Sequence, residues 1–327
     1  MPRALVYGSG SIGILYGFIL SHAGMDVTCL CRSNYERAAA DGFTVRSTVL
    51  GDHHFRPHVV KSIDDLVRIG STEFEYVVIC TRALPSNKAS AAEIAPLLAT
   101  GRSAVVIIQN GIGVEQVYAN MHSGKCIISA VTYSPTEQMS PTEIRNTESI
   151  ITHLGLFPAD AGVGKGSAKL ETLETLCARL NAGGAMAKSH TDIQAERWKK
   201  VISNAVWNPV CALSRCRDVE FVGASPLAGE FIRAAMTEVV AVATAVGYGG
   251  VVDEAAIDAQ LTRTAARPWP GVQPSMMADL LAKKHLEMDA IVGEIVRLAR
   301  NHGVGVPRLE TLYLLLRGYE QKRCATP

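Results

Sequence analysis

The sequence has no long run of like charge, and its charges nearly cancel. It contains 32 Lys and Arg residues against 31 Asp and Glu residues, which gives a formal net charge of +1 at pH 7. Proteins that bind nucleic acid or an anionic membrane surface usually carry a clustered excess of basic residues. The composition therefore implies neither kind of partner.

The sequence also lacks an apolar stretch long enough to cross a bilayer. The first apolar run, Ile12 to Leu20, is too short for a span, and Gly13 and Gly17 interrupt it. Because a strand-like segment precedes this run, we do not interpret it as a signal peptide. We expect no membrane association.

Paired C-x-x-C spacing is absent from the eight cysteines. This favours reduced thiols in a reducing compartment, and we predict a cytoplasmic protein. His53, His54 and His58 lie close in sequence, but adjacent residues of a strand point to opposite faces, and no Cys or carboxylate has ligand spacing to them. We therefore predict no metal site. The last residues, Cys324 to Pro327, do not match a prenylation signal.

The chain has 327 residues, of which 48% are hydrophobic, enough for two domains or one large domain. Strand-like and helical segments alternate up to residue 189, and nearly every later segment has a helical pattern. We predict an α/β fold, with a Rossmann-type doubly wound sheet over residues 1–189 and an all-helical domain over residues 190–327. The segments 43–48 and 55–60 are predicted to form a hairpin, and residues 275–301 are predicted to contain one long helix.

A glycine motif follows the first predicted strand and opens the first predicted helix. In this context, G-x-G-x-x-G indicates a dinucleotide site, because the glycines allow a tight turn, a close approach of the backbone to a pyrophosphate, and close packing of helix on strand. The helix N-terminus would then face the phosphates. The predicted cofactor-binding residues are Gly8, Ser9, Gly10, Ser11, Ile12 and Gly13.

Arg32 follows the second predicted strand, where an NAD-preferring fold usually has an acidic residue for the ribose 2′-hydroxyl. A cation there, next to Ser33 and Asn34, suits a 2′-phosphate, so we predict NADP(H) as the cofactor. The alternative is that Arg32 is a solvated loop residue.

Arg82 and Asn110 follow two further predicted strands. Loops at the carboxyl ends of the strands line the ligand crevice of a doubly wound sheet, so we expect both side chains to face it. The alternatives are an ordinary surface arginine and a turn residue of an Asn-Gly pair.

Lys200, Asn204 and Asn208 are spaced four residues apart and lie on one helix face, drifting by about 40° per step. Apolar residues flank this polar stripe, so it should face an enclosed space, where an ammonium and two amides need hydrogen-bond partners. A bound ligand could supply them. The alternative is a solvated helix face.

Glu287 lies along an apolar edge of the last predicted long helix, which is unusual for a carboxylate without a partner. We expect it to pair with Lys200, although a local pair with Lys283 or Lys284 is equally consistent with the spacing. Ser275 precedes a helical run, as an N-cap residue would.

Together these residues resemble the ketopantoate reductase (2-dehydropantoate 2-reductase) family. The likeness covers essentially the whole chain and rests on the glycine motif, Asn110-Gly111, the segment from Trp198 to Pro209, the segment from Ser275 to Asp279, and Glu287 with Asp289. The pattern W-x-K-x-x-x-N-x-x-x-N-P joined to S-M-x-x-D and E-x-D is specific to this family.

The resemblance implies an NADPH-dependent reduction of 2-dehydropantoate to (R)-pantoate, a step toward pantothenate and coenzyme A. It implies that Lys200 protonates the carbonyl oxygen and that Glu287 orients Lys200 or binds the new hydroxyl. It further implies that Asn110 lies near the nicotinamide and that Asn204, Asn208 and Ser275 bind the substrate. The helical domain would be of the 6-phosphogluconate dehydrogenase-like type, and a homodimer is consistent with it.

Two positions depart from the family pattern. Arg82 stands where the family often has Lys, and Asp218 stands where it often has Asn. A carboxylate near an anionic substrate leaves a reductase of another 2-keto acid or ketone open. A non-catalytic NADP(H) sensor is a further alternative, although it would not need a Lys200–Glu287 pair.

Overall fold

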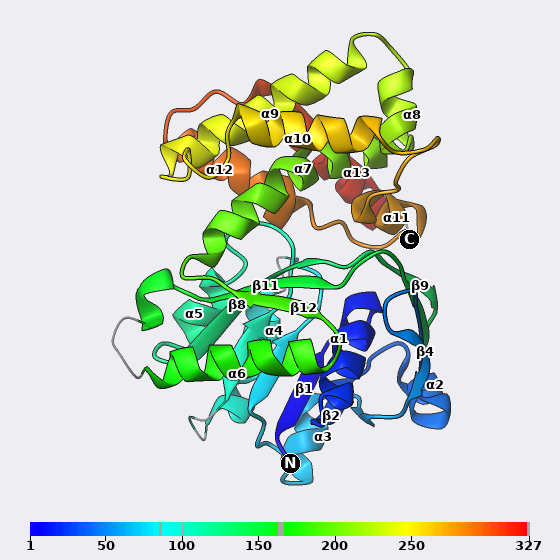
Figure 1. The fold of residues 1–327 in the computed structure, drawn as a ribbon, viewed down its shortest axis with the longest axis vertical. Coiled ribbons are helices and arrows are strands. Elements are labelled where there is room, and N and C mark those ends of the chain that lie inside the picture. Colours follow the sequence, from blue (N-terminus) through cyan, green and yellow to red (C-terminus); the bar gives the residue numbers. More distant parts are fainter. Residues whose placement is uncertain (85–86, 100, 102, 163–166, 326–327) are drawn as a thin grey trace. The chain divides into compact units, whose positions relative to one another are not determined.

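The protein was analysed as a computed structural model, and the structure describes residues 1–84, 87–99, 101, 103–162 and 167–325. The chain divides into two compact units, which we call the sheet unit and the helical unit (Figure 1). The sheet unit comprises Met1–Arg82, Ser86–Gln109 and Val114–Ile193, and the helical unit comprises Ala83–Pro85, Asn110–Gly113 and Gln194–Pro327. Two short loops from the N-terminal half therefore belong to the helical unit.

Among the described residues, the sheet unit contains an eight-stranded sheet in the order β12-β11-β8-β7-β6-β1-β2-β5. The strands from β5 to β8 are parallel and have the 3-2-1-4-5-6 order of a dinucleotide-binding fold, which confirms the predicted Rossmann-type class. β11 runs antiparallel to β8, and β12 is parallel to β11. The strands are β1 (Arg3–Tyr7), β2 (Asp26–Leu30), β5 (His58–Val60), β6 (Tyr76–Ile79), β7 (Ala104–Ile107), β8 (Cys126–Tyr133), β11 (Ile151–Leu156) and β12 (Met186–Ser189).

Helices cover both faces of this sheet because its central strands are apolar on both sides. β6 and β7 are buried at every position, as expected for parallel strands between two helical layers. Alternate residues such as Ala4 and Val6 share one core with α1 and α6. The helical segments are α1 (Ser11–His22), α2 (Tyr35–Asp41), α3 (Ile63–Arg68), α4 (Asn87–Glu93), η1 (Ala95–Leu98), α5 (Gln116–Met121), η2 (Ala159–Gly162) and α6 (Ala168–Ala182).

A second sheet in this unit has the order β4-β3-β10-β9 and packs against α1. Its strands are β3 (Phe43–Ser47), β4 (Gly51–Phe55), β9 (Thr136–Ser140) and β10 (Glu143–Asn146). The predicted hairpin was wrong in its second strand: β3 pairs with residues 51–55, whereas residues 58–60 join the main sheet beside β2. Phe55 ends β4 with its side chain buried in the core, so an apolar residue there marked the end of a strand and not its beginning.

The helical unit is built around a core of residues from α7, α9, α11, α12 and α13. The predicted all-helical character of this half is confirmed. Its elements are α7 (Ile193–Ser214), α8 (Asp218–Gly223), α9 (Ala228–Ala245), α10 (Glu254–Ala265), α11 (Ser275–Leu281), the π-helix η3 (Asp289–Gly293), α12 (Glu294–Asn301) and α13 (Pro307–Ala325).

The predicted long helix over residues 275–301 is interrupted. α11 ends at Leu281, Lys283 has a left-handed φ of 54°, and residues 284–287 are not helical before the chain resumes with η3. Residues 307–325, for which the sequence analysis delimited no helix, form α13.

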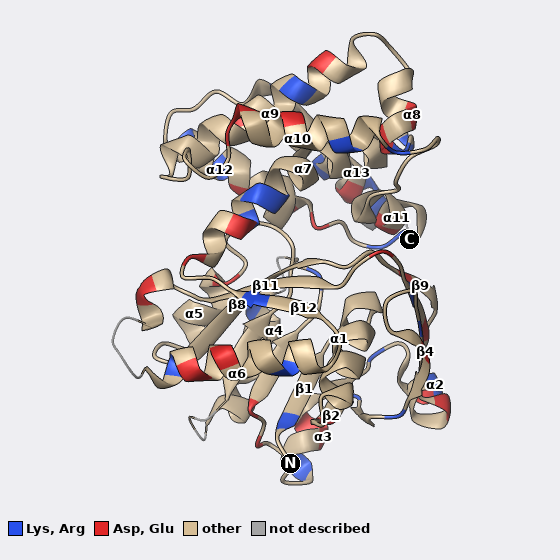
Figure 2. Cartoon of the chain, viewed as in Figure 1, with Lys and Arg blue, Asp and Glu red and all other residues tan. Residues whose placement is uncertain are grey.

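Basic and acidic residues are interspersed along the chain of each unit (Figure 2). No helix in the described part of the chain combines the length and the apolar character needed to cross a bilayer.

Candidate active site

The glycine motif forms a tight loop between β1 and α1. Gly8 has a φ of 104°, and a Cβ there would lie 2.8 Å from the Thr81 backbone nitrogen. A Cβ on Gly13 would lie 2.0 Å from the Gly8 carbonyl oxygen, so helix and loop can approach this closely only with glycine at both positions. A Cβ on Gly10, in contrast, would meet no described atom within 4 Å.

The open space at Gly10 lies at the N-terminus of α1, where no side chain caps the helix. Ser11 and Ile12 begin this helix, and their backbone N–H groups belong to its uncapped first turn. Such a terminus binds an anion through backbone N–H groups and the helix dipole. The loop therefore fits the pyrophosphate of a dinucleotide.

The side chains of Ser9 and Asn34 hold the glycine loop in place through hydrogen bonds. The buried Ser9 hydroxyl donates to the Leu30 carbonyl oxygen at 2.9 Å, and Asn34 Nδ2 donates to the Ser9 carbonyl oxygen at 2.9 Å. Ser9 thus acts on the geometry of the loop, with its side chain turned toward β2.

Arg32 follows β2 and keeps a guanidinium that is 63% exposed. Its Nη2 donates to the Tyr7 hydroxyl at 2.7 Å and lies 3.2 Å from Glu93 Oε2. Arg32 is therefore neither an unpaired solvated charge nor fully available to a phosphate, because an acidic residue of α4 shares it.

The loop after β6 contains Arg82, and the loop after β7 contains Gln109 and Asn110. Arg82 lies just after β6 with a partly buried side chain. Gln109, after β7, donates from Nε2 to the Thr81 carbonyl oxygen at 2.9 Å, so the two loops are joined within the sheet unit. The next residue, Asn110, belongs to the helical unit.

The loop Asn110–Gly113 packs against η3 of the helical unit. The Ile112 backbone N–H donates to the Ala290 carbonyl oxygen at 3.0 Å, and a Cβ on Gly111, whose φ is 101°, would lie 2.3 Å from that same oxygen. Arg197, buried on α7, donates from Nη1 to the Gly111 carbonyl oxygen at 3.0 Å. The loop is thus held from two elements.

Lys200 on α7 donates from Nζ to Asn110 Oδ1 at 2.7 Å. Burial and, to a smaller extent, the nearby Arg197 guanidinium lower the pKa of Lys200, the Glu287 carboxylate opposes both effects, and the resulting pKa is about 8. Asn110 is an acceptor here and not only a turn residue. An ammonium with this pKa can donate a proton near neutral pH.

Glu287 precedes η3 and is not on a helix, in contrast to the predicted position. The Ala83 backbone N–H donates to its Oε1 at 2.8 Å, and its charge acts on Lys200. Its hydrogen bond with Ala83 and its effect on Lys200 favour the pairing with Lys200 over a local pair with Lys283 or Lys284. The carboxylate thus contacts the loop at residue 83.

The other two residues of the polar stripe, Asn204 and Asn208, differ in burial and in hydrogen bonding. Asn208 is 3% exposed, and its Oδ1 accepts from Ser275 Oγ at 3.3 Å and from the Met276 backbone N–H at 3.1 Å. Asn204 is partly buried, and its amide has no hydrogen-bond partner within the described ranges. Ser275 is the first residue of α11, behind Pro274 at the N-cap, so its hydroxyl does not cap the helix.

Asp218 does not present a carboxylate to this stripe. It is 1% exposed, its Oδ1 accepts from the Val219 and Val272 backbone N–H groups at 2.9 and 2.7 Å, and its Oδ2 pairs with Arg267. Its charge is balanced within the loop that leads to Ser275. The carboxylate expected to face an anionic substrate is thus a structural residue of that loop.

Sequence reasoning assigned no role to Arg197, although the residue lies three positions before Lys200 and therefore on a neighbouring part of the same helix face. This spacing was the available signal. Its hydrogen-bond partner, the Gly111 carbonyl oxygen, is 86 residues away in sequence, so the sequence contained no signal for that contact. In the part of the chain that the structure describes, no three His, Cys, Asp or Glu residues gather as a metal site.

A doubly wound sheet with an open glycine loop is typical of dinucleotide-binding enzymes, and the family that the chain matches makes it an oxidoreductase. Residues 4–159 match the family described as "Ketopantoate reductase PanE/ApbA", and residues 192–320 match "Ketopantoate reductase PanE/ApbA C terminal". The chain belongs to the ketopantoate reductase family.

Individual relatives are distant. The chain is 25% identical over 324 residues to the Meiotically up-regulated gene 72 protein of Schizosaccharomyces pombe, covering 96% of this chain but only 56% of that protein. It is 29% identical to the crystal structure of 2-dehydropantoate 2-reductase from Methylococcus capsulatus, with a TM-score of 0.82 over 98% of this chain and 97% of the other. It shares its fold with D-mandelate dehydrogenase bound to NADH and anilino(oxo)acetate, at 20% identity, a TM-score of 0.82, and 99% coverage of both chains.

Proposed function

We propose that this chain reduces 2-dehydropantoate to (R)-pantoate with NADPH, in the cytoplasmic route toward pantothenate and coenzyme A. The observation that carries the proposal is the cluster of Lys200, Asn110 and Glu287, in which the Lys200 ammonium has a pKa of about 8. The family match and the 29% identity to a 2-dehydropantoate 2-reductase support the choice of substrate.

The chemistry divides between cofactor and protein. Bound NADPH supplies the hydride that adds to the carbonyl carbon of the keto acid. Lys200 gives one proton from its ammonium to the carbonyl oxygen, which completes the hydroxyl and leaves a neutral amine. Before the transfer, the positive charge of Lys200 stabilises the negative charge that develops on that oxygen.

The neighbours of Lys200 have complementary roles in this proposal. Asn110 Oδ1 accepts one N–H of the ammonium and so directs the remaining donors. Glu287 keeps the pKa from falling further and holds the ammonium charged at neutral pH. Asn204, whose amide has no partner among the described residues, offers donors to the substrate carboxylate, with Asn208 and Ser275 behind it.

The proposed preference for NADPH over NADH rests on residues of the sheet unit. Gly8 to Gly13 hold the pyrophosphate at the start of α1, and the exposed Arg32 binds the 2′-phosphate. Arg82 contributes a second cation after β6. NADPH is therefore proposed to bind more tightly than NADH.

The test is oxidation of NADPH, followed at 340 nm with 2-dehydropantoate, for the wild type, Lys200→Ala and Lys199→Ala. Lys199 is a matched control because it is the next residue on α7 but makes only an exposed pair with Glu196. Loss of the general acid should lower kcat by about 10² to 10⁴ while NADPH still binds, and Lys199→Ala should keep the wild-type rate. Equal rates in all three proteins would disprove the role of Lys200.

A second candidate is a reductase of a different 2-keto acid. The observation that favours it is the missing amide at residue 218: the family often has Asn there, whereas this chain has Asp218, whose carboxylate is bound by the protein's own loop. A panel of 2-keto acids separates the two candidates, because the better substrate will have the higher kcat/KM with the same dependence on Lys200.

A further inference from the structure

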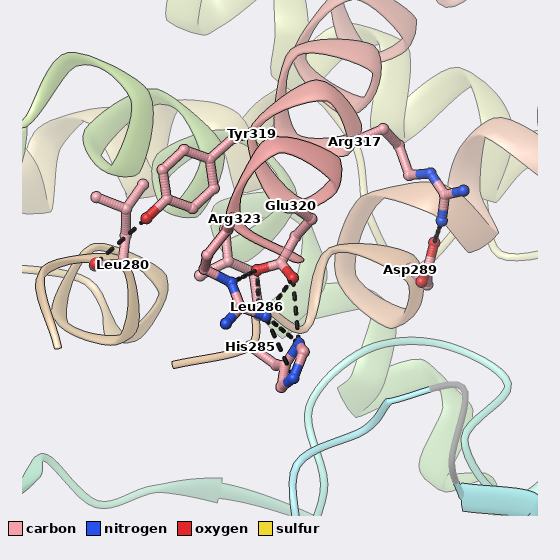
Figure 3. A network of polar contacts seen from close by, with 8 residues as sticks. All are labelled: Leu280, His285, Leu286, Asp289, Arg317, Tyr319, Glu320 and Arg323. Carbon is pink, nitrogen blue, oxygen red and sulfur yellow. Dashed lines mark hydrogen bonds and ion pairs between the residues drawn. The ribbon is translucent and has the colours of Figure 1, made fainter. Parts of the chain in front are cut away.

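A buried glutamate of α13 holds the backbone next to Glu287. Glu320 is only 8% exposed, and its Oε1 accepts from the Leu286 backbone N–H at 3.2 Å. Its Oε2 lies 3.2 Å from His285 Nδ1 and accepts from Arg323 Nη2 at 2.8 Å (Figure 3). The C-terminal helix thus contacts the chain one residue before the proposed catalytic carboxylate.

The same helix face holds the chain on the other side of Glu287. Tyr313 donates from its hydroxyl to Asp289 Oδ1 at 2.6 Å. Arg317 Nη1 lies 3.8 Å from the same oxygen, as Figure 3 shows for Arg317 and Asp289. Tyr313, Arg317 and Glu320 are spaced four and three residues apart, so they share one face of α13. Glu287 is therefore flanked by two anchors from one helix.

These anchors matter because Glu287 has little regular structure of its own. Residues 284–287 are not helical, and Lys283 has a left-handed backbone. Glu287 joins the following helix through its carbonyl oxygen, which accepts from the Ile291 backbone N–H at 3.1 Å, whereas the segment before it forms no helical turn. The bond from Leu286 N–H to Glu320 is a direct constraint on the backbone of that segment.

We propose that Glu320 is a positioning residue, which fixes the backbone at Leu286 so that the Glu287 carboxylate stays within electrostatic reach of Lys200. This inference rests on the proposed roles of Lys200 and Glu287. It concerns how their pairing is maintained, and it names a residue of α13 whose hydrogen bonds within the described part of the chain go to His285, Leu286 and Arg323.

Arg323, His285 and Leu286 form hydrogen bonds with Glu320, and an ionised carboxylate can accept all of them. Burial alone would raise the pKa of Glu320, but hydrogen bonds from Arg323, His285 and Leu286 outweigh it, so the pKa lies below its usual range. Replacement by glutamine keeps the size but introduces an NH₂ group among donors. At least one of the surrounding hydrogen bonds must then break.

Glu238 on α9 provides a matched control. It is 7% exposed, and its carboxylate accepts from the Arg308 and Leu309 backbone N–H groups at 3.1 and 3.0 Å and pairs with the Arg308 guanidinium at 3.1 Å. Glu238 therefore accepts backbone N–H groups at the start of α13, as Glu320 accepts one in the segment before η3. Only Glu320 holds a backbone group next to Glu287.

The experiment compares Glu320→Gln with Glu238→Gln in the full-length protein. We expect similar decreases in Tm, because both variants disturb a buried carboxylate with backbone and arginine partners. Only Glu320→Gln should lower kcat, by about tenfold, with the KM for the keto acid changed by less than about twofold. The conservative variant Glu320→Asp should recover part of that loss, and it replaces Glu320→Gln if the latter does not fold.

A second readout needs neither substrate nor turnover. The Lys200 ammonium is titrated by NMR in protein labelled at lysine, with Lys200→Arg used to assign its signal. If Glu287 moves away, it supports the charged lysine less, so Glu320→Gln should titrate at lower pH than the wild type, and Glu238→Gln should not differ.

The inference is overturned if Glu320→Gln and Glu238→Gln lose the same Tm while the Lys200 titration and kcat remain those of the wild type. Failure of the proposed function has a different signature. In that case the wild type reduces no 2-keto acid, while the NMR titration still reports whether Glu320 controls the Lys200–Glu287 pair.

Discussion

Raising the pH above 8 should remove the proton that Lys200 donates. The pKa of Lys200 is lowered to about 8 from an ordinary value of 10.5, chiefly by burial and then by Arg197. Above this pKa, each further pH unit lowers the protonated fraction about tenfold, so at pH 9.5 only about 3% of the enzyme remains active in reduction. An unperturbed lysine would still be about 90% protonated at that pH.

Whether the rate rises or falls with pH follows from the role of Lys200 as the proton donor. A general acid must be protonated, so kcat/KM for reduction should be level well below pH 8, reach half of that level near pH 8 and fall above it. The reverse oxidation needs the neutral amine as a base and should rise over the same range. Both inflections report one group if they occur at the same pH.

The assay is kcat/KM for 2-dehydropantoate from NADPH oxidation between pH 6 and 10, because kcat/KM reports the pKa of the free enzyme, with Lys200→Arg as the comparison. Arginine keeps the positive charge but does not titrate in this range, so the variant should be slow and should show no inflection near pH 8. A wild-type rate that stays constant to pH 9.5 contradicts the lowered pKa. An inflection that persists in Lys200→Arg assigns the titration to another group.

Three further variants test the remaining parts of the site. Asn204→Ala should raise the KM for the keto acid by about tenfold without weakening NADPH binding, since it removes one hydrogen bond to a carboxylate; steady-state kinetics and NADPH titration check this. Glu93→Gln removes the internal partner of the proposed 2′-phosphate site and should tighten NADPH, but not NADH, by about twofold to fivefold in a fluorescence titration; equal effects on both cofactors would refute the role of the pair. Gly111→Ala forces a Cβ to within 2.3 Å of the Ala290 carbonyl oxygen and should lower both Tm and kcat, whereas Gly303→Ala, with a positive φ of 68° but open space, should lower Tm only slightly.

The features that could be predicted from the sequence are those with local causes. The glycine motif has a strand before it and a helix after it, and its spacing directly reflects the contacts of Gly8 with Thr81 and of Gly13 with Gly8. The polar stripe of α7 follows from the helical period alone. Arg197 and Glu320 were not identified, because their roles come from partners 86 and 34 residues away, at Gly111 and Leu286.

Glu287 was identified by its spacing to Leu280 and Ile291, but it was placed on a long helix that the structure interrupts. Leu280 and Ile291 are both buried, so the apolar pattern continues across a segment that is not helical. What opens the helix is non-local: Leu286 N–H has an acceptor on α13, and the Ala290 carbonyl of the π-helix accepts from Ile112. These bonds offset the lost helical ones, and π-helical turns of this kind often occur at functional sites. The interruption takes Glu287 out of the continuous helix that the apolar pattern predicts, and its carboxylate accepts from the Ala83 backbone N–H and raises the pKa of Lys200.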